Sequence, residues 1–135
     1  RIEDALKSVT GFEDSVWLSH PILGMVTCCP SNLGTGMRGS VHMLLPELIA
    51  REGLEGVDRL CRERNCQARG SSGEHSTVVD RVDVSNWRRI GFPEYQLVDD
   101  MIECANFLAA EEDKLSRLLR EHGAEGGAQY RRSRL

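Results

Sequence analysis

The sequence is poor in aromatic residues and lacks a long apolar run, an excess of positive charge and a paired cysteine framework. Aromatic side chains make up 5% of its 135 residues against 40% hydrophobic residues, so its core must be mostly aliphatic. No apolar stretch approaches the length that crosses a bilayer, so we expect no membrane span. The net charge of -4 argues against non-specific nucleic-acid binding, and we expect no nucleic-acid partner.

The cysteines are odd in number and irregularly spaced, which is typical of a reducing intracellular compartment, cytoplasmic or organellar. They are Cys28, Cys29, Cys61, Cys66 and Cys104. Around Cys61 and Cys66 there is no second Cys or His pair at zinc-finger spacing, so we expect no metal site. The chain begins at Arg1 and not at a methionine, so the sequence does not decide whether a targeting segment precedes it.

Hydrophobic periodicity predicts an α+β fold in which an antiparallel β-sheet is flanked by α-helices. Helices are expected at 2–9, 47–64 and 93–122, and strands at 22–28, 38–46, 66–71 and 77–85. In the last strand, Val82 and Val84 alternate with Arg81 and Asp83, which fits one buried face. We assign residues 1–122 to one domain or part of one, and residues 123–135 to a flexible basic tail.

The helix at 93–122 is expected to bury one apolar stripe. Its members are Tyr95, Val98, Ile102, Ala105, Leu108, Leu115 and Leu118. Pro93 suits the first turn and Gly123 can close the other end. In the helix at 47–64, Gly53 and Gly56 are expected to weaken the middle.

The segment "TCCPSNLGTGMR", from Thr27 to Arg38, brings a thiol, a turn and a guanidinium together. The Ser31 hydroxyl and the Arg38 guanidinium would both stabilise a thiolate at Cys29. Because side chains alternate along a strand, we expect Cys29 to be exposed and Cys28 to lie in the core. The alternative is that both are small core residues, as free cysteines usually are.

Arginine is followed by glycine at Arg38 and at Arg69. Such an arginine can hold phosphate oxygens bidentately while the glycine lets the backbone approach, although a solvated surface charge is the simpler alternative. The loop "GSSG" at 70–73 could bind an anion through backbone N–H groups, but it lacks the lysine of a P-loop. Beyond it, Glu74 and His75 fit acid–base work or cation binding, or an ordinary hairpin tip.

Three blocks, "CPSNLGTGMRGSVHMLLP", "ARGSSGEHS" and "DVSNWRRIGFPEYQLV", together resemble the phosphagen (ATP:guanidino) kinases, the arginine and creatine kinase family. The resemblance runs from about Arg1 to Leu119 and implies part of the C-terminal catalytic domain, with its glutamine synthetase-like fold. The family passes the terminal phosphoryl group of ATP, bound with Mg, to a guanidino nitrogen. The resemblance therefore implies ATP or ADP with Mg as ligands and a guanidino substrate.

The resemblance also implies roles for individual residues. Catalysis would involve the reactive cysteine Cys29 and the substrate carboxylate Glu74. The nucleotide and its phosphates would be bound by Arg38, Ser40, Val41, His42, Arg69, Ser71, Gly73 and Asp83. Glu74 favours arginine as substrate, whereas "CPSNLGTG" is closer to the creatine branch, and Ser72 stands where arginine kinases have a further phosphate-contacting arginine.

Complete members of the family have a helical N-terminal domain and an acidic strand upstream of this region. We therefore expect the chain alone to hold only part of an active site and not to be a competent kinase. An N-terminal half or a protein partner would cover the open edge of its sheet. The alternatives are a catalytically inert, kinase-like accessory or structural subunit of a larger assembly, and a nucleotide-binding module without turnover.

Overall fold

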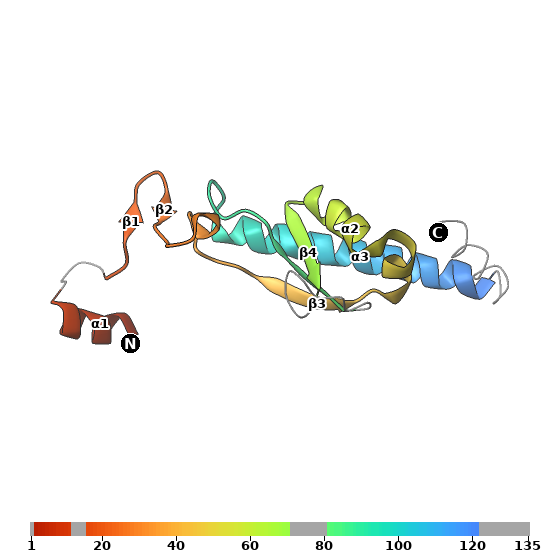
Figure 1. The fold of residues 1–135 in the computed structure, drawn as a ribbon, viewed down its shortest axis with the longest axis horizontal. Helices are drawn as coiled ribbons and strands as arrows, with labels where there is room; N and C mark the ends of the chain where they lie inside the picture. The colour runs from red at the N-terminus through yellow and green to blue at the C-terminus, as the bar shows by residue number, and fades with distance from the viewer. Residues whose placement is uncertain (1, 12–15, 71–80, 122–135) are drawn as a thin grey trace. The chain divides into compact units, whose positions relative to one another are not determined.

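The computed structural model describes residues 2–11, 16–70 and 81–121, and their element order confirms the predicted α+β class (Figure 1). The helices are α1 (Ile2–Thr10), α2 (Pro46–Arg62), α3 (Glu94–Glu121) and the 3-10 helix η1 (Pro30–Asn32). The strands are β1 (Ser19–His20), β2 (Gly24–Met25), β3 (Ser40–Leu44), β4 (Cys66–Gly70) and β5 (Arg81–Asn86). Two compact units result: one runs to Met37 and includes Arg88–Glu94, and the other combines Arg38–Trp87 with the chain from Tyr95 on.

The second unit is built on an antiparallel sheet with the strand order β3-β5-β4. Val84 of the central strand pairs with Val41 on one side and with Ala68 on the other. Val82 and Val84 are buried while Arg81 is exposed, which confirms the predicted alternation. The sheet thus has one apolar and one polar face.

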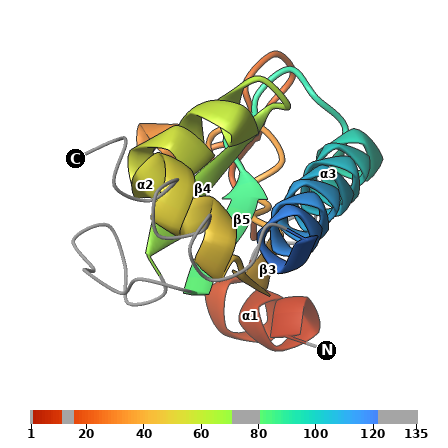
Figure 2. The same ribbon diagram turned by 90° about the vertical axis from the view of Figure 1, so that its right-hand side faces the viewer.

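Both long helices of the second unit cover the apolar face, as their shared core shows (Figure 2). The core residues are Leu45, Leu48, Val57, Cys61, Cys66, Ala68, Val82, Val84, Cys104, Leu108 and Leu115. Helix α2 follows β3 directly, because Pro46 cannot extend the strand but suits the first helical turn. It kinks at Gly53, whose φ of 68° and ψ of 172° leave the helical region.

The apolar stripe predicted for α3 is only partly right. Leu108 and Leu115 are buried, but Tyr95, Ile102 and Leu118 are exposed. The line that faces the core contains Leu97, Cys104, Leu108 and Leu115. With ~3.6 residues per turn these fall on one narrow strip, and Tyr95 and Ile102 fall on its far side. The predicted stripe left out Leu97 and Cys104, which are both buried.

In the first unit, α1 confirms the helix predicted at 2–9, although none of its residues is buried. The buried strand predicted at 22–28 is wrong. The chain instead turns back on itself, and β1 pairs with β2 through Ser19↔Met25 and His20↔Gly24. Gly24 has a φ of 67°, and a Cβ there would collide with the backbone of Gly34. This left-handed position and Pro21 break the extended run that the apolar residues suggested.

None of the described helices combines the length and apolarity that a bilayer crossing requires.

Candidate functional site

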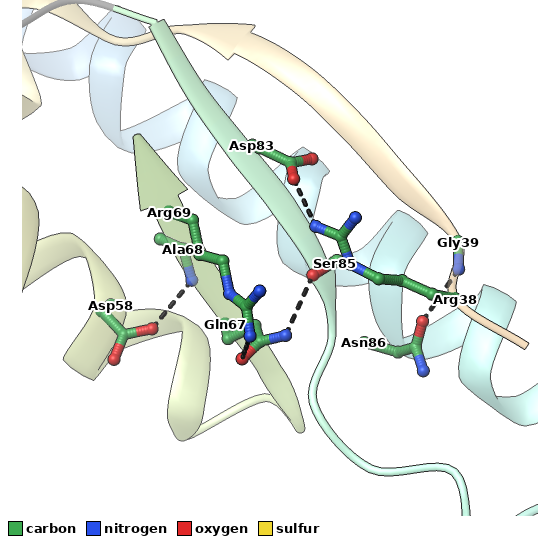
Figure 3. A network of polar contacts seen from close by, with 9 residues as sticks. All are labelled: Arg38, Gly39, Asp58, Gln67, Ala68, Arg69, Asp83, Ser85 and Asn86. Carbon is green, nitrogen blue, oxygen red and sulfur yellow. Dashed lines mark hydrogen bonds and ion pairs between the residues drawn. The ribbon is translucent and has the colours of Figure 1, made fainter. Parts of the chain in front are cut away.

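The polar face of the sheet carries Ser40, His42, Arg69 and Asp83 among the predicted site residues. Figure 3 shows Arg69 and Asp83 on this face. The strand register forms two cross-strand rows, Ser40–Ser85–Gln67 and His42–Asp83–Arg69. Residues paired across antiparallel strands share a face, so Ser40, His42, Asp83 and Arg69 all lie opposite Val82 and Val84. Val41 is different: it packs against the core, which leaves only its backbone for a site on the polar face.

Arg38 joins this face just before β3 begins, and its Nη2 donates to Oδ2 of Asp83 in an ion pair (Figure 3). The adjacent backbone is fixed as well, because the Gly39 N–H donates to Oδ1 of Asn86 at 2.9 Å. The other carboxylate oxygen of Asp83, Oδ1, is buried without a hydrogen-bond partner among the described residues. A buried acceptor of this kind suits a ligand that brings a donor.

Arg69 is held by two buried polar residues that the sequence analysis missed. Its Nη2 donates to Oε1 of Gln67 at 3.3 Å, and Nε2 of Gln67 donates to Oγ of Ser85 at 3.3 Å (Figure 3). Gln67 and Ser85 are both buried. Each lies two positions from a predicted site residue, Gln67 before Arg69 and Ser85 after Asp83. The two-residue repeat of strands would therefore have found them.

Helix α2 supplies a hydrogen-bond acceptor to a backbone N–H of the edge strand β4. Oδ1 of Asp58 accepts the Ala68 N–H at 2.8 Å (Figure 3). Oδ2 of the same carboxylate accepts Nε of Arg62 at 3.2 Å. This contact ties the strand that carries Arg69 to the helix behind it. Strand β3, which follows Arg38, forms the opposite edge.

Cys29 belongs to the first unit, where it directly precedes η1. Its carbonyl accepts Oγ1 of Thr27 at 2.8 Å and the Asn32 N–H at 2.9 Å, and its Sγ lies 3.0 Å from Oγ of Ser31. Hydrogen bonds from the Ser31 hydroxyl and backbone, with a smaller contribution from the Arg89 charge, lower the pKa of the Cys29 thiol. Arg89 was not among the predicted residues.

Cys29 is exposed, as predicted, but Cys28 is exposed too, which corrects its assignment to the core. The strand on which that assignment depended does not form, so the expected alternation of the two thiols is lost.

The remaining thiols form a buried cluster in the core of the second unit. Cys61, Cys66 and Cys104 come from α2, β4 and α3 and have no exposed surface. Hydrogen bonds to the Cys104 sulfur, together with burial, raise the pKa of Cys61 and Cys66. All five cysteines of the chain are free thiols.

Several predicted site residues fall in the segment 71–80, which the structure does not describe. Ser71, Gly73 and Glu74 lie outside the described residues, as do Ser72 and His75. Within residues 2–11, 16–70 and 81–121, no cluster of three or more His, Cys, Asp or Glu side chains is arranged to hold a metal ion.

Comparison with known proteins links this arrangement to one family. The family model described as "ATP:guanido phosphotransferase, C-terminal catalytic domain" matches residues 3–115. Arginine kinase Oct f 2 of Amphioctopus fangsiao is 45% identical over 91 residues, which are 67% of this chain and 25% of that protein. Arginine kinase of Turbo cornutus is 49% identical over 80 residues, 58% of this chain and 22% of that protein. The chain thus spans about a quarter of the length of these relatives.

Two solved kinase structures have a fold similar to that of this chain. Lombricine kinase superposes with a TM-score of 0.69 at 34% identity, covering 86% of this chain and 30% of that one. The duplicated taurocyamine kinase from Schistosoma mansoni, with bound transition state analog components, superposes with a TM-score of 0.62 at 34% identity. That match covers 81% of this chain and 15% of the kinase.

Proposed function

Because the chain belongs to the ATP:guanido phosphotransferase family through its C-terminal catalytic domain, we propose that it is the nucleotide- and substrate-binding portion of an ATP:guanidino phosphotransferase. The observation that carries the proposal is the polar face on which Arg38, Arg69 and Asp83 converge opposite the core. Arg69 lies on a strand, and Arg38 is held against the same face by Asp83, so the two guanidinium groups can together hold the oxygens of a polyphosphate.

In this proposal Arg38 and Arg69 bind phosphate oxygens of ATP or ADP and neutralise the charge of the transferring phosphoryl group. Ser40 and His42 line the nucleotide site next to them, Val41 contributes its backbone, and Ser71 to Gly73 complete the phosphate loop. The unsatisfied Oδ1 of Asp83 supplies an acceptor for a nucleotide donor. Mg would arrive with the nucleotide and be held mainly by its phosphates.

The substrate side of the site is assigned to Cys29 and Glu74. A guanidino nitrogen would attack the terminal phosphorus, forming an N–P bond as the bond to the ADP oxygen breaks, and Glu74 would accept the guanidinium proton. The thiolate of Cys29 would attract the positive guanidinium. Arginine is the favoured substrate, since both curated relatives named above are arginine kinases.

The remaining charges of the active site would come from outside this sequence, from an N-terminal half or a protein partner. That same element would cover the edge of the sheet at β3. We therefore propose that the chain alone transfers phosphoryl groups poorly. Its free thiols fit a reducing compartment.

Nucleotide binding to the 135-residue chain tests the proposal. Titration calorimetry with Mg-ADP should show binding that weakens about tenfold or more in Arg38→Gln and in Arg69→Gln, since each loses a charge-assisted contact to phosphate. Arg117→Gln changes the same charge at an exposed position of α3 and should bind like the parent. Absence of binding, or equal binding by all three variants, would contradict the proposal. Binding without transfer to arginine would favour an inert subunit or a binding module.

A further inference from the structure

Arg89 joins two segments of the first unit that lie far apart in the sequence. Its side chain is 6% exposed, and Nη1 donates to the carbonyl oxygen of Ser31 at 2.8 Å. Its own carbonyl accepts the N–H of Thr35 at 3.2 Å. One residue therefore holds the loop that follows Cys29 at two points, by its side chain and by its backbone. Arginine side chains are rarely buried unless the guanidinium is paired with an acceptor, as it is here with the Ser31 carbonyl.

The absence of a side chain at Gly34 makes this contact possible. Gly34 has a φ of 104°, and a Cβ there would collide with the backbone of Arg89 and Ile90. The loop after Cys29 is thus pressed directly onto the 88–94 segment. A glycine at a positive φ in close backbone contact is a requirement of this geometry, because other residues would fit neither the dihedral nor the space.

Ser31 connects Arg89 to the thiol of Cys29. Its Oγ lies 3.0 Å from Sγ of Cys29, and its carbonyl oxygen accepts the Arg89 guanidinium. Since Ser31 lies within the three-residue η1, a fixed carbonyl restricts the whole turn, including the hydroxyl that faces the sulfur. The guanidinium also brings a positive charge close to Cys29. Arg89 therefore acts on the thiol both through the turn and through its charge.

We propose that Arg89 is a positioning residue for Cys29. Arg89 clamps the turn at residues 30–32, so that Ser31 faces the sulfur. Its positive charge favours the thiolate. In the phosphotransferase reaction Arg89 would not touch the substrate. It would keep the Cys29 sulfur anionic and correctly placed for the guanidinium of the substrate. This assignment rests on the proposed function only where it takes Cys29 to face the guanidino substrate; the clamp itself belongs to the first unit alone.

Alkylation of Cys29 tests the proposal without any nucleotide. In a Cys28→Ser background Cys29 is the one exposed thiol, because Cys61, Cys66 and Cys104 are buried. The rate of reaction with iodoacetamide is measured by mass spectrometry across a pH series. In Arg89→Gln we expect a rate about twofold to fivefold lower near neutral pH, the size of one partly screened charge, and convergence with the parent at high pH.

Two further variants make the test specific. Arg89→Lys keeps the charge on a shorter group and should recover part of the neutral-pH rate. Arg117→Gln removes the same charge at an exposed position of α3 and should follow the parent curve. Folding of each variant is checked by circular dichroism. If Arg89→Gln does not fold, the Arg89→Lys curve decides: a shift toward higher pH supports the proposal.

A curve for Arg89→Gln, or for Arg89→Lys in its place, that superimposes on the parent curve would overturn the proposal. A rate changed by one factor at every pH would also overturn it, since that result reports altered access to the sulfur and not a stabilised thiolate. Because the assay contains no nucleotide, its outcome is separate from that of the Mg-ADP titration. The clamp and the proposed function can therefore fail independently.

Discussion

The carboxylate of Asp83 on the central strand holds the guanidinium of Arg38 at the entrance to β3, on the polar face of the sheet (Figure 3). The Asp83 side chain is only 13% exposed, whereas that of Arg38 is 37% exposed. The arginine is thus kept on the face by a partner that is itself mostly withdrawn from water. A phosphate that binds Arg38 must share the guanidinium with this carboxylate.

We expect the two residues to be coupled energetically. Arg38→Met leaves a largely buried carboxylate without its cation and should lower the free energy of unfolding by about 1–3 kcal/mol. Asp83→Asn should cost less, because the remaining guanidinium reaches water. In the double variant the loss should be smaller than the sum, with a coupling of about 0.5–3 kcal/mol. Urea unfolding of the four proteins measures the cycle, and strictly additive losses would contradict it.

A second prediction concerns the start of α2, which is capped from another helix. Oε1 and Oε2 of Glu112 in α3 accept the N–H groups of Glu47 and Leu48 at 2.9 Å and 2.8 Å. The residue at the N-cap position, Leu45, makes no side-chain cap bond of its own. Glu112→Ala should therefore lower the free energy of unfolding by about 1–2 kcal/mol, as the loss of an N-cap does.

The neighbouring glutamate is the matched control for this cap. Glu111 makes an ion pair with Lys114 at 3.6 Å on the surface of α3. Glu111→Ala should cost about 0–0.5 kcal/mol, since exposed pairs on a helix contribute little. Equal losses for the two alanine variants, measured by thermal or urea unfolding, would show that the cap of α2 does not matter.

A third prediction concerns the pH dependence of Cys29. The hydrogen bonds from Ser31 are the largest influences that lower the pKa of its thiol. Ser31→Ala should therefore move the alkylation curve of Cys29 toward higher pH, and by more than Arg89→Gln does. Ser8→Ala removes an exposed hydroxyl from α1 and should leave the curve unchanged. An unshifted curve for Ser31→Ala would rule out this origin of thiolate stabilisation.

The free energy of unfolding should depend on pH through the same Cys29 thiol. Because the folded-state pKa of Cys29 is lower than the unfolded one, the folded protein releases this proton at a lower pH. The thiolate therefore contributes stability that grows as pH rises through the folded-state pKa, is fully present above the unfolded value, and is lost as pH falls. The melting temperature of the parent, compared with that of Ser31→Ala across pH, should diverge on the alkaline side.

Local patterns in the sequence were enough to predict much of the second unit. The alternation around Val82 and Val84 identified β5 and its buried face, and it also implied that Asp83 lies on the other face. The strand order was beyond such patterns. Arg38 and Asp83 are 45 positions apart, and nothing local shows that β5 lies in the middle of the sheet.

The errors have a common physical origin, since each depended on contacts between distant segments. The run at 22–28 is apolar enough for a strand, but Gly24 turns the chain against Gly34. On α3 the position of the apolar stripe depends on which side meets the sheet, and Cys104 belongs to that side. In the sequence, nothing distinguishes Arg89 from a surface arginine; its contact with the distant Ser31 does.

The central place of β5 also has a consequence for how the chain folds. Strands β4 and β5 are neighbours along the chain, whereas β3 is separated from β5 by all of α2 and β4. Pairings between nearby segments cost less chain entropy, so we expect the β4–β5 pair to form early and β3 to dock late. An early folding intermediate would then carry Arg69 and Asp83 already in register while Arg38 and His42 were still unplaced. The polar face would be completed only in the last step.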